Sequence, residues 1–218
     1  HRQARAPLRV ARLGEARVIA QGTLSRKGFL NVALRTEKLR ASQITYANVK
    51  KYPFDAIVDL KATIGGAVAD PAIEARLNLS EMTVGTRKVP PSYVDVALKA
   101  NTLEASLNML GGALNAKVKS QLGGRQQYSV AAELRELAYP LLIPGGDALK
   151  GRISAELNLA GSLADAARST GELKLSVLEF EASDMKFALK QPTTVALPSL
   201  TRTSARMRRI RLLGSVAA

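Results

Sequence analysis

The sequence contains no cysteine, no tryptophan and a single histidine, His1. Without cysteine the chain has no disulfide bonds and no thiolate metal sites, and one terminal histidine cannot support histidine-based catalysis or a histidine-rich metal site. No phosphate-binding loop or nucleophile-elbow motif occurs either. We therefore expect a protein that is not an enzyme and that binds no cofactor and no metal ion.

Aromatic residues are scarce and long hydrophobic runs are missing. Aromatics make up 4% of the chain and hydrophobic residues 46%, so the apolar side chains are mostly small and aliphatic. The longest apolar runs, such as Leu141–Ile143, fall far short of the roughly 20 residues that a membrane-spanning helix needs. No signal peptide is visible, and the chain begins at His1 rather than at methionine. We expect it to be a piece of a longer polypeptide.

Basic residues outnumber acidic ones, 32 to 18, which gives a net charge of +14. Such a surplus favours anionic partners, namely phospholipid head groups, nucleic acid or acidic polysaccharide. The alternative is that Lys and Arg protect the edge strands of a β-sheet. Sheets that bind single-stranded nucleic acid use aromatic platforms among basic residues. Only residues 46–54, YANVKKYPF, offer such a platform, and they equally suit a packed strand end, so we expect no nucleic-acid partner.

Residues 151–190 show the clearest pattern in the sequence. Apolar residues alternate with polar ones from Ile153 to Leu159, and this period of two is typical of a half-buried β-strand. Residues 161–171, bounded by two glycines, predict a turn before alternation restarts at Leu173. The phase slips at Val177-Leu178, which indicates a β-bulge.

The same alternation recurs along much of the chain. It covers five further segments and is punctuated by turn signals at Gly65-Gly66, Asp70-Pro71 and Gly111-Gly112. These segments are 54–64, 73–79, 94–98, 103–109 and 114–122. The pattern predicts an all-β protein with an elongated, curled antiparallel sheet. Residues 133–143 are an exception, because their apolar residues have helical spacing and Pro140 blocks a long helix. We expect a short helix or turn there that plugs the sheet.

An internal repeat suggests how the sheet is organised. Residues 58–70 align with 153–165 in their apolar positions and in their Ala-Asp turn, and repeated strand–turn–strand units are typical of sheets that grow by addition. We predict a basic terminal arm or edge strand at 1–20, a first β-repeat unit at 21–143 ending in the plug, and a second unit at 144–218. The two units could equally form one continuous domain.

Several motifs resemble those of a known family. The pattern G-x-I-x-A-x-L-x-L-x-G-x-L-A-D spans 151–165, G-E-L-K-L follows at 171–175, and Leu-Gly-Gly stands at 110–112. The strand from Asp184 to Leu189 runs into Gln191-Pro192, with a later Leu213-Gly214 step. Together they resemble the TamB/AsmA-like family, the translocation-and-assembly-module proteins of bacterial envelopes, as a partial segment.

This resemblance implies a location and a function. It implies an inner-membrane anchor outside this chain, a long curled sheet in the periplasm, and phospholipid acyl chains held in an apolar β-groove between the inner and outer membranes of a Gram-negative cell. It also implies a role in outer-membrane biogenesis and protein assembly, with an outer-membrane barrel partner. Burial of an acyl chain gains roughly 0.8 kcal/mol per methylene, so an aliphatic trough can hold lipid without directional contacts.

Candidate residues follow from the alternation. The expected lipid-contacting residues are Val58, Leu60, Ile64, Leu77, Leu79, Leu107, Met109, Leu114, Val118, Ile153, Leu157, Leu159, Leu173, Leu175 and Val177. Lys117, Lys119, Arg152 and Lys174 are the expected head-group contacts at the groove rim. The main rival is a purely structural scaffold whose apolar face packs on itself. Glu179 and Glu181 share a strand face with Asp184 nearby, but no residue that could tune their pKa is evident, so we do not expect this carboxylate pair to be catalytic.

Overall fold

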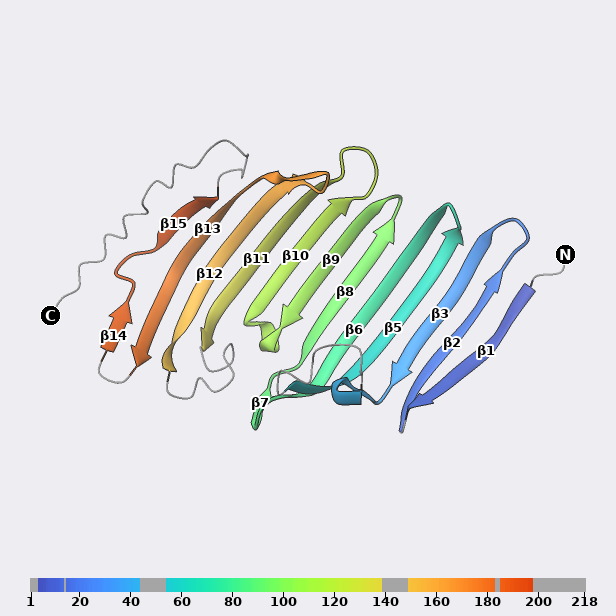
Figure 1. Cartoon of the computed structure of the whole chain (residues 1–218), viewed down its shortest axis with the longest axis horizontal. Helices are drawn as coiled ribbons and strands as arrows, with labels where there is room; N and C mark the ends of the chain where they lie inside the picture. The colour runs from blue at the N-terminus through green and yellow to red at the C-terminus, as the bar shows by residue number, and fades with distance from the viewer. Residues whose placement is uncertain (1–3, 14, 44–53, 139–148, 183–184, 198–218) are drawn as a thin grey trace.

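The computed structural model describes residues 4–13, 15–43, 54–138, 149–182 and 185–197. These residues form one antiparallel sheet of fifteen strands (Figure 1). In the N-terminal half the strands are β1 (Ala4–Leu13), β2 (Ala16–Leu24), β3 (Phe29–Glu37), β4 (Leu39–Arg40), β5 (Phe54–Ala67), β6 (Asp70–Val84) and β7 (Arg87–Val89). The others are β8 (Ser92–Lys99), β9 (Thr102–Met109), β10 (Leu114–Gln121), β11 (Gln127–Ala138), β12 (Leu149–Ser162), β13 (Asp165–Ala182), β14 (Met185–Ala188) and β15 (Thr193–Leu197).

The strands follow one another across the sheet in chain order. Four short strands pair with longer ones: β4 pairs with β5, β7 with β6, and β14 and β15 both pair with β13. Two short 3-10 turns, η1 (Ala41–Gln43) and η3 (Leu110–Gly112), complete the described structure. The all-β, curled antiparallel sheet predicted from the alternation is confirmed.

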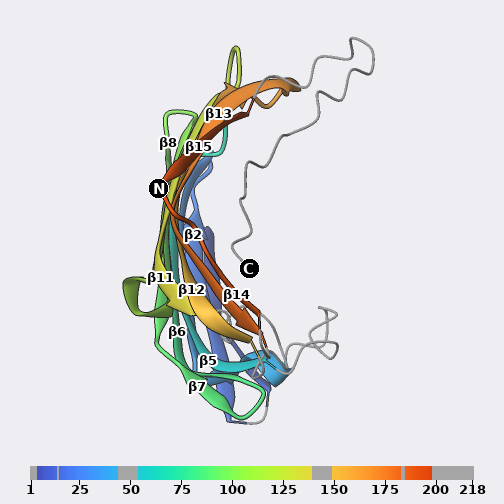
Figure 2. The ribbon, with the colours of Figure 1, turned by 90° about the vertical axis from the view of Figure 1, so that its left-hand side faces the viewer.

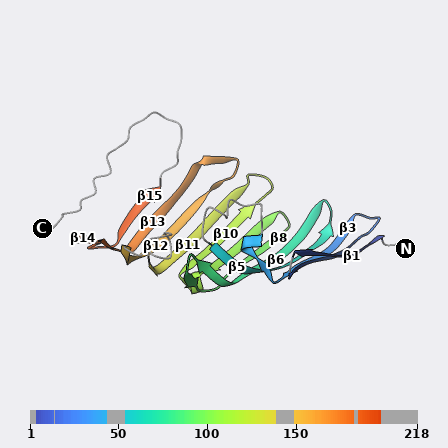
Figure 3. The same cartoon turned by 60° about the horizontal axis from the view of Figure 1, so that its bottom comes forward.

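The sheet is a single curled layer. Figure 2 shows it bent along the strands, and Figure 3 shows the same layer from its lower end. The ladder between β11 and β12, which includes the pair Leu134–Ala155, crosses the boundary predicted between residues 143 and 144. The two predicted repeat units are therefore joined by ordinary strand pairing.

The predicted plug at 133–143 is wrong where the structure describes it. Residues 133–138 continue β11, and residues 139–143 lie outside the described part of the chain. The register of β11 on β12 shifts between Leu134 and Leu137, around Glu136 with a φ of 43°. A bulge adds one residue to a strand and shifts its side-chain phase. The bulge therefore explains why Leu134 and Leu137 have helical spacing although both lie in a strand.

The long turn predicted at 161–171 is also wrong. The chain turns at Leu163-Ala164 alone, and Gly161 and Gly171 both lie inside strands. A Cβ atom on Gly171 would collide with the carbonyl oxygen of Asn158 and the side chain of Leu159. These glycines permit close approach of neighbouring strands, a role that sequence alone does not separate from turn formation.

A small buried cluster lies at one end of β5 and β6. Ala41 of η1 and Val89 of β7 pack there on Ala56 and Met82. Nearby, β5 stops pairing with β3 and begins to pair with β4. There the hydroxyl of Thr36 donates a hydrogen bond to the carbonyl of Val58 (3.0 Å) and accepts one from the amide of Leu60 (2.8 Å). The end of the sheet thus has its own core and satisfied backbone groups.

Candidate functional site

One face of the sheet is lined almost entirely by aliphatic side chains, and we call it the aliphatic face. Residues that are direct partners in adjacent antiparallel strands project to the same side of a sheet, so the register traces this face across strands. One row runs without a break through Leu60, Leu77, Val94, Leu107, Ala116, Ala132, Leu157 and Leu173. The row crosses the sheet from β5 to β13.

All but one of the predicted lipid-contacting residues lie together on this face. Val58, Leu60, Ile64, Leu77, Leu79, Leu107, Met109, Leu114, Val118, Ile153, Leu157, Leu159, Leu173 and Leu175 are each half-buried there. Val177 instead pairs with Ser154, on the opposite face. The reason is that the register on β12 shifts between Ser154 and Ala155, so the bulge falls at Ser176 and restores the phase at Leu178.

Little covers the aliphatic face. Among the described residues the only elements folded onto it are η1 and β7 at one end, where η1 packs near Val58 and Leu79. Figure 2 shows η1 on the inner side of the curl, so the aliphatic face is the inner one. Its large side chains are half-buried by their neighbours rather than by a second layer. The self-packed core of the rival interpretation is thus not formed by the described residues.

The four predicted rim cations do not lie at a rim. Their strand partners place Lys117, Lys119, Arg152 and Lys174 on the opposite, polar face of the sheet. Lys119 pairs with Glu104 at 2.8 Å, Lys174 with Glu156 at 3.2 Å, and Arg152 with Glu179 at 2.7 Å and Glu136 at 2.9 Å. Since these cations alternate with aliphatic residues along each strand, period two alone assigns them to the other face.

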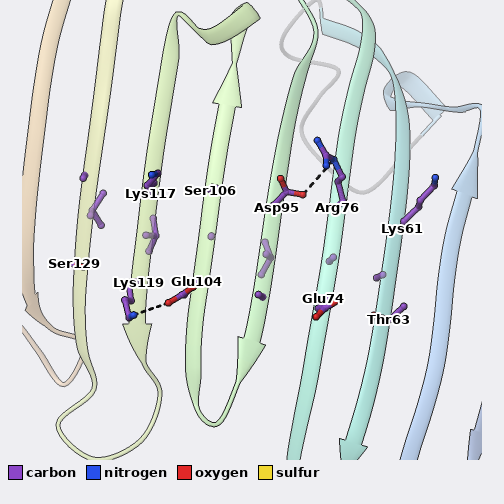
Figure 4. Close-up of a pocket in the computed structure, with 18 of the residues that line it drawn as sticks. Lys61, Thr63, Glu74, Arg76, Asp95, Glu104, Ser106, Lys117, Lys119 and Ser129 are labelled. Carbon is purple, nitrogen blue, oxygen red and sulfur yellow. Dashed lines mark ion pairs between the residues drawn. The ribbon is translucent and has the colours of Figure 1, made fainter.

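A large hollow also lies on the polar face. It has a volume of about 1670 Å³ and crosses the sheet from β2 to β13. Its lining residues come in groups of three neighbours, such as Lys61, Ala62 and Thr63, whereas Leu60 and Ile64 beside them do not line it. The side chains of Lys61 and Thr63 therefore form the walls, and backbone forms the floor (Figure 4).

Ion pairs shift the acidity of several carboxylates on the polar face. Hydrogen bonds from Arg152 lower the pKa of Glu179, and those from Arg135 lower the pKa of Glu133. At Asp55, desolvation raises the pKa, but hydrogen bonds from Ser42 and Arg40 outweigh it and leave the pKa lowered. All these carboxylates are ionised at neutral pH, as expected for structural ion pairs rather than for general acids.

The remaining candidate sites give no constellation for catalysis. Glu179 is paired with Arg152 and Glu181 with Lys186 at 3.5 Å, while Asp184 lies outside the described residues. The described part of the chain holds no group of acidic or histidine residues that could bind a metal ion, and no helix in it could cross a membrane. The aromatic-basic stretch 46–54 lies outside the described residues except for Phe54.

The fold and its two faces define the class of protein: an open, single-layered β-sheet, aliphatic on one side and charged on the other, built from consecutive hairpins. The chain belongs to the TamB family, since the model of the TamB C-terminal domain matches residues 8–196. This is an envelope-associated family of non-enzymatic proteins involved in lipid or protein assembly. Searches of curated proteins and of solved structures found no match.

Proposed function

We propose that this chain carries phospholipid between the inner and outer membranes of a Gram-negative envelope, with acyl chains lying on the aliphatic face. It would act in the periplasm as part of a longer parent anchored in the inner membrane. The parent would also serve outer-membrane protein assembly with a barrel partner. The observation that carries the proposal is the aliphatic row from Leu60 to Leu173, which crosses the sheet without a second layer of described residues over it.

The physical argument rests on desolvation. Half-buried aliphatic side chains leave apolar surface in contact with water, and an acyl chain laid along the row removes that surface and its own from water. The row has no charged member, so no strong polar contact fixes the lipid at one position. A phosphate head group could not enter the face unpaired without a large penalty and would stay in solvent.

The test is to extract the gently purified protein with organic solvent and measure phospholipid by mass spectrometry. We expect near-stoichiometric phospholipid in the wild type. Leu159→Asp should abolish it, because a carboxylate on the aliphatic face repels an acyl chain. Ala160→Asp is the matched control: Ala160 is the next residue, is exposed on the polar face, and should keep its lipid.

Circular dichroism decides whether loss of lipid reflects the face or the fold. We expect Leu159→Asp and Leu175→Asp to retain β-structure while losing lipid. If both variants unfold, the milder Leu159→Asn replaces them in the same extraction. A lipid-free wild type, or equal lipid loss in Ala160→Asp, would contradict the proposal and favour a structural scaffold.

A further inference from the structure

Three cations stand side by side on the polar face of neighbouring strands. Arg35 of β3 is the direct partner of Lys61 on β5, and Lys61 is the direct partner of Arg76 on β6. All three line the hollow on the polar face. Like charges directly opposite one another destabilise a pair of strands, so this row opposes the folding of the isolated sheet.

Opposite charges also stand directly opposite one another on the polar face. Lys119 is the direct partner of Glu104, and Lys174 is the direct partner of Glu156. Each of these pairs forms an ion pair, at 2.8 and 3.2 Å. The register can therefore match opposite charges, although Glu133 and Glu156 on β11 and β12, and Arg12 and Arg17 on β1 and β2, are like-charged pairs. The row at β3, β5 and β6 brings three like charges together instead of two.

The two arginines of the row are held in place from outside it. The guanidinium of Arg76 lies 5.0 Å from the centre of the Tyr93 ring, and its Nε is 3.5 Å from Asp95 and donates to Asn78 at 3.3 Å. Arg35 has Glu37 at 3.5 Å on its own strand. Figure 4 shows the Arg76–Asp95 contact and Lys61 on the neighbouring strand.

Lys61 has no such partner. It is exposed and forms no ion pair or side-chain hydrogen bond with the other described residues. The terminal nitrogens of Arg76 are also not engaged in the contacts that fix its Nε. Two anchored guanidinium groups thus flank a free ammonium group, and Thr63 adds a hydroxyl two residues along β5.

We infer that Lys61, flanked by Arg35 and Arg76, forms a binding site for a phosphate group on the polar face. Guanidinium groups donate paired hydrogen bonds to phosphate oxygens, and an ammonium group adds a compact charge. Strands about 4.8 Å apart place the three side chains within reach of one anion. Because the sheet is one layer thick, this site is separate from the aliphatic face and does not depend on lipid binding there.

The experiment titrates the purified chain with inorganic phosphate at constant ionic strength, with sodium chloride as the matched salt. Binding is followed by calorimetry and by the phosphate-dependent rise in the thermal midpoint. We expect Lys61→Met to weaken phosphate binding roughly tenfold or more, the scale of one charge-assisted contact.

Lys117→Met is the control variant. Lys117 lines the same hollow and forms no ion pair in the described part of the chain, but its direct partners are Ser106 and Ala131 rather than arginines. We expect it to bind phosphate like the wild type. Equal weakening in both variants would show only a diffuse attraction to positive charge and would overturn the site.

Stability without phosphate provides a second readout. Removing Lys61 relieves repulsion from both arginines, so Lys61→Met should raise the unfolding midpoint at low salt while losing the rise caused by phosphate. A lysine with a merely structural role would lower the midpoint when replaced, and that result would contradict the inference.

A second experiment, with lipid vesicles, distinguishes a lipid head group from a soluble phosphate ligand. Vesicles of phosphatidylglycerol and of phosphatidylcholine are mixed with wild type and Lys61→Met, and bound protein is separated by flotation. Vesicle binding that requires both phosphatidylglycerol and Lys61 supports a lipid head group. Lys61-dependent binding of inorganic phosphate without binding to the vesicles supports a soluble ligand. No Lys61-dependent binding in either arm would refute the site.

Discussion

The hairpins β5–β6 and β12–β13 start alike and end differently. The strands β5 and β12 each have 14 residues, and both hairpins turn through two residues, Val68-Ala69 and Leu163-Ala164. On the return, β6 has 15 residues whereas β13 has 18. The extra residues enter near the turn, where the register shifts between Ala160 and Ser162.

The larger difference is in what covers the aliphatic face of each hairpin. The end of β5–β6 has η1 and β7 folded onto it, and Ala56 and Met82 are buried there. At the matching end of β12–β13, β14 extends the sheet sideways, and Met185 and Phe187 stay 70% and 51% exposed. Among the described residues, the same strand chemistry therefore yields a core at one hairpin and an exposed surface at the other, and the segments beside the strands make the difference.

The largest effect is expected at Gly171 in the β12–β13 hairpin, which we call the open hairpin; β5–β6 is the covered hairpin. Gly171→Ala places a methyl group against the carbonyl of Asn158 and the side chain of Leu159, so β12 and β13 must move apart. We expect a loss of about 3 kcal/mol in the free energy of unfolding, measured by urea denaturation and circular dichroism.

Gly65→Ala is the matched change in the covered hairpin. The carbonyl of Leu30, at 4.0 Å, would be in ordinary van der Waals contact with the added methyl group, so the methyl group fits without a clash. We expect a change within about 0.5 kcal/mol. Equal destabilisation by the two substitutions would show that glycine is needed in these strands for flexibility rather than for close approach.

A smaller loss is expected at the strand switch beside the covered hairpin. Thr36→Val removes the hydroxyl that satisfies the carbonyl of Val58 and the amide of Leu60. Two backbone groups then lose their partner, which costs about 1–3 kcal/mol in the free energy of unfolding. Thr36→Ser keeps the hydroxyl and should recover most of the loss in the same urea measurement. If the serine variant is as unstable as the valine variant, the methyl group matters instead.

The smallest effect is expected at the ion pairs of the open hairpin, and it depends on pH. Arg152 lowers the pKa of Glu179, so this pair stabilises the fold above the unfolded glutamate pKa of about 4.3 and loses its effect as pH falls through the lower folded value. Arg152→Ala should lower the urea midpoint slightly at pH 7 and by a smaller amount at pH 3.

Arg125→Ala is the control for net charge. Arg125 forms no ion pair with the other described residues, so its removal should not alter the pH dependence. A midpoint that falls equally in the two variants at pH 7 would assign the effect to overall charge rather than to the contact with Glu179.

The fold was largely predictable because period two is a strong local signal in this chain. Alternation placed every lipid-contacting candidate before the bulge at Ser176 on one face, and failed at Val177 because one inserted residue inverts the phase. Bulges also explain the false helix at 133–138. The phase slip at Val177-Leu178 indicated the bulge in β13, but not that Ser176 is its extra residue. Which residue finds no partner across the ladder depends on the neighbouring strand as well.

The candidate sites were predictable only in part. Alternation alone assigns Lys117 and Arg152 to the polar face. Their predicted place at a groove rim came from the expected contact with lipid head groups and not from the strand pattern. The row of Arg35, Lys61 and Arg76 could not be found in the sequence, because it depends on the registers of β3 on β5 and of β5 on β6. Alternation assigns each of the three cations to the polar face, but it does not show that they are direct partners on neighbouring strands.

The order of strands has a mechanical consequence. Along the main path each strand pairs only with its neighbours in sequence, from β1 to β14. A pull on the two ends of such a sheet loads one ladder at a time, so strands would peel away singly under low force rather than break together. The same connectivity keeps loop-closure distances short, so a sheet of this kind can assemble strand by strand from one end.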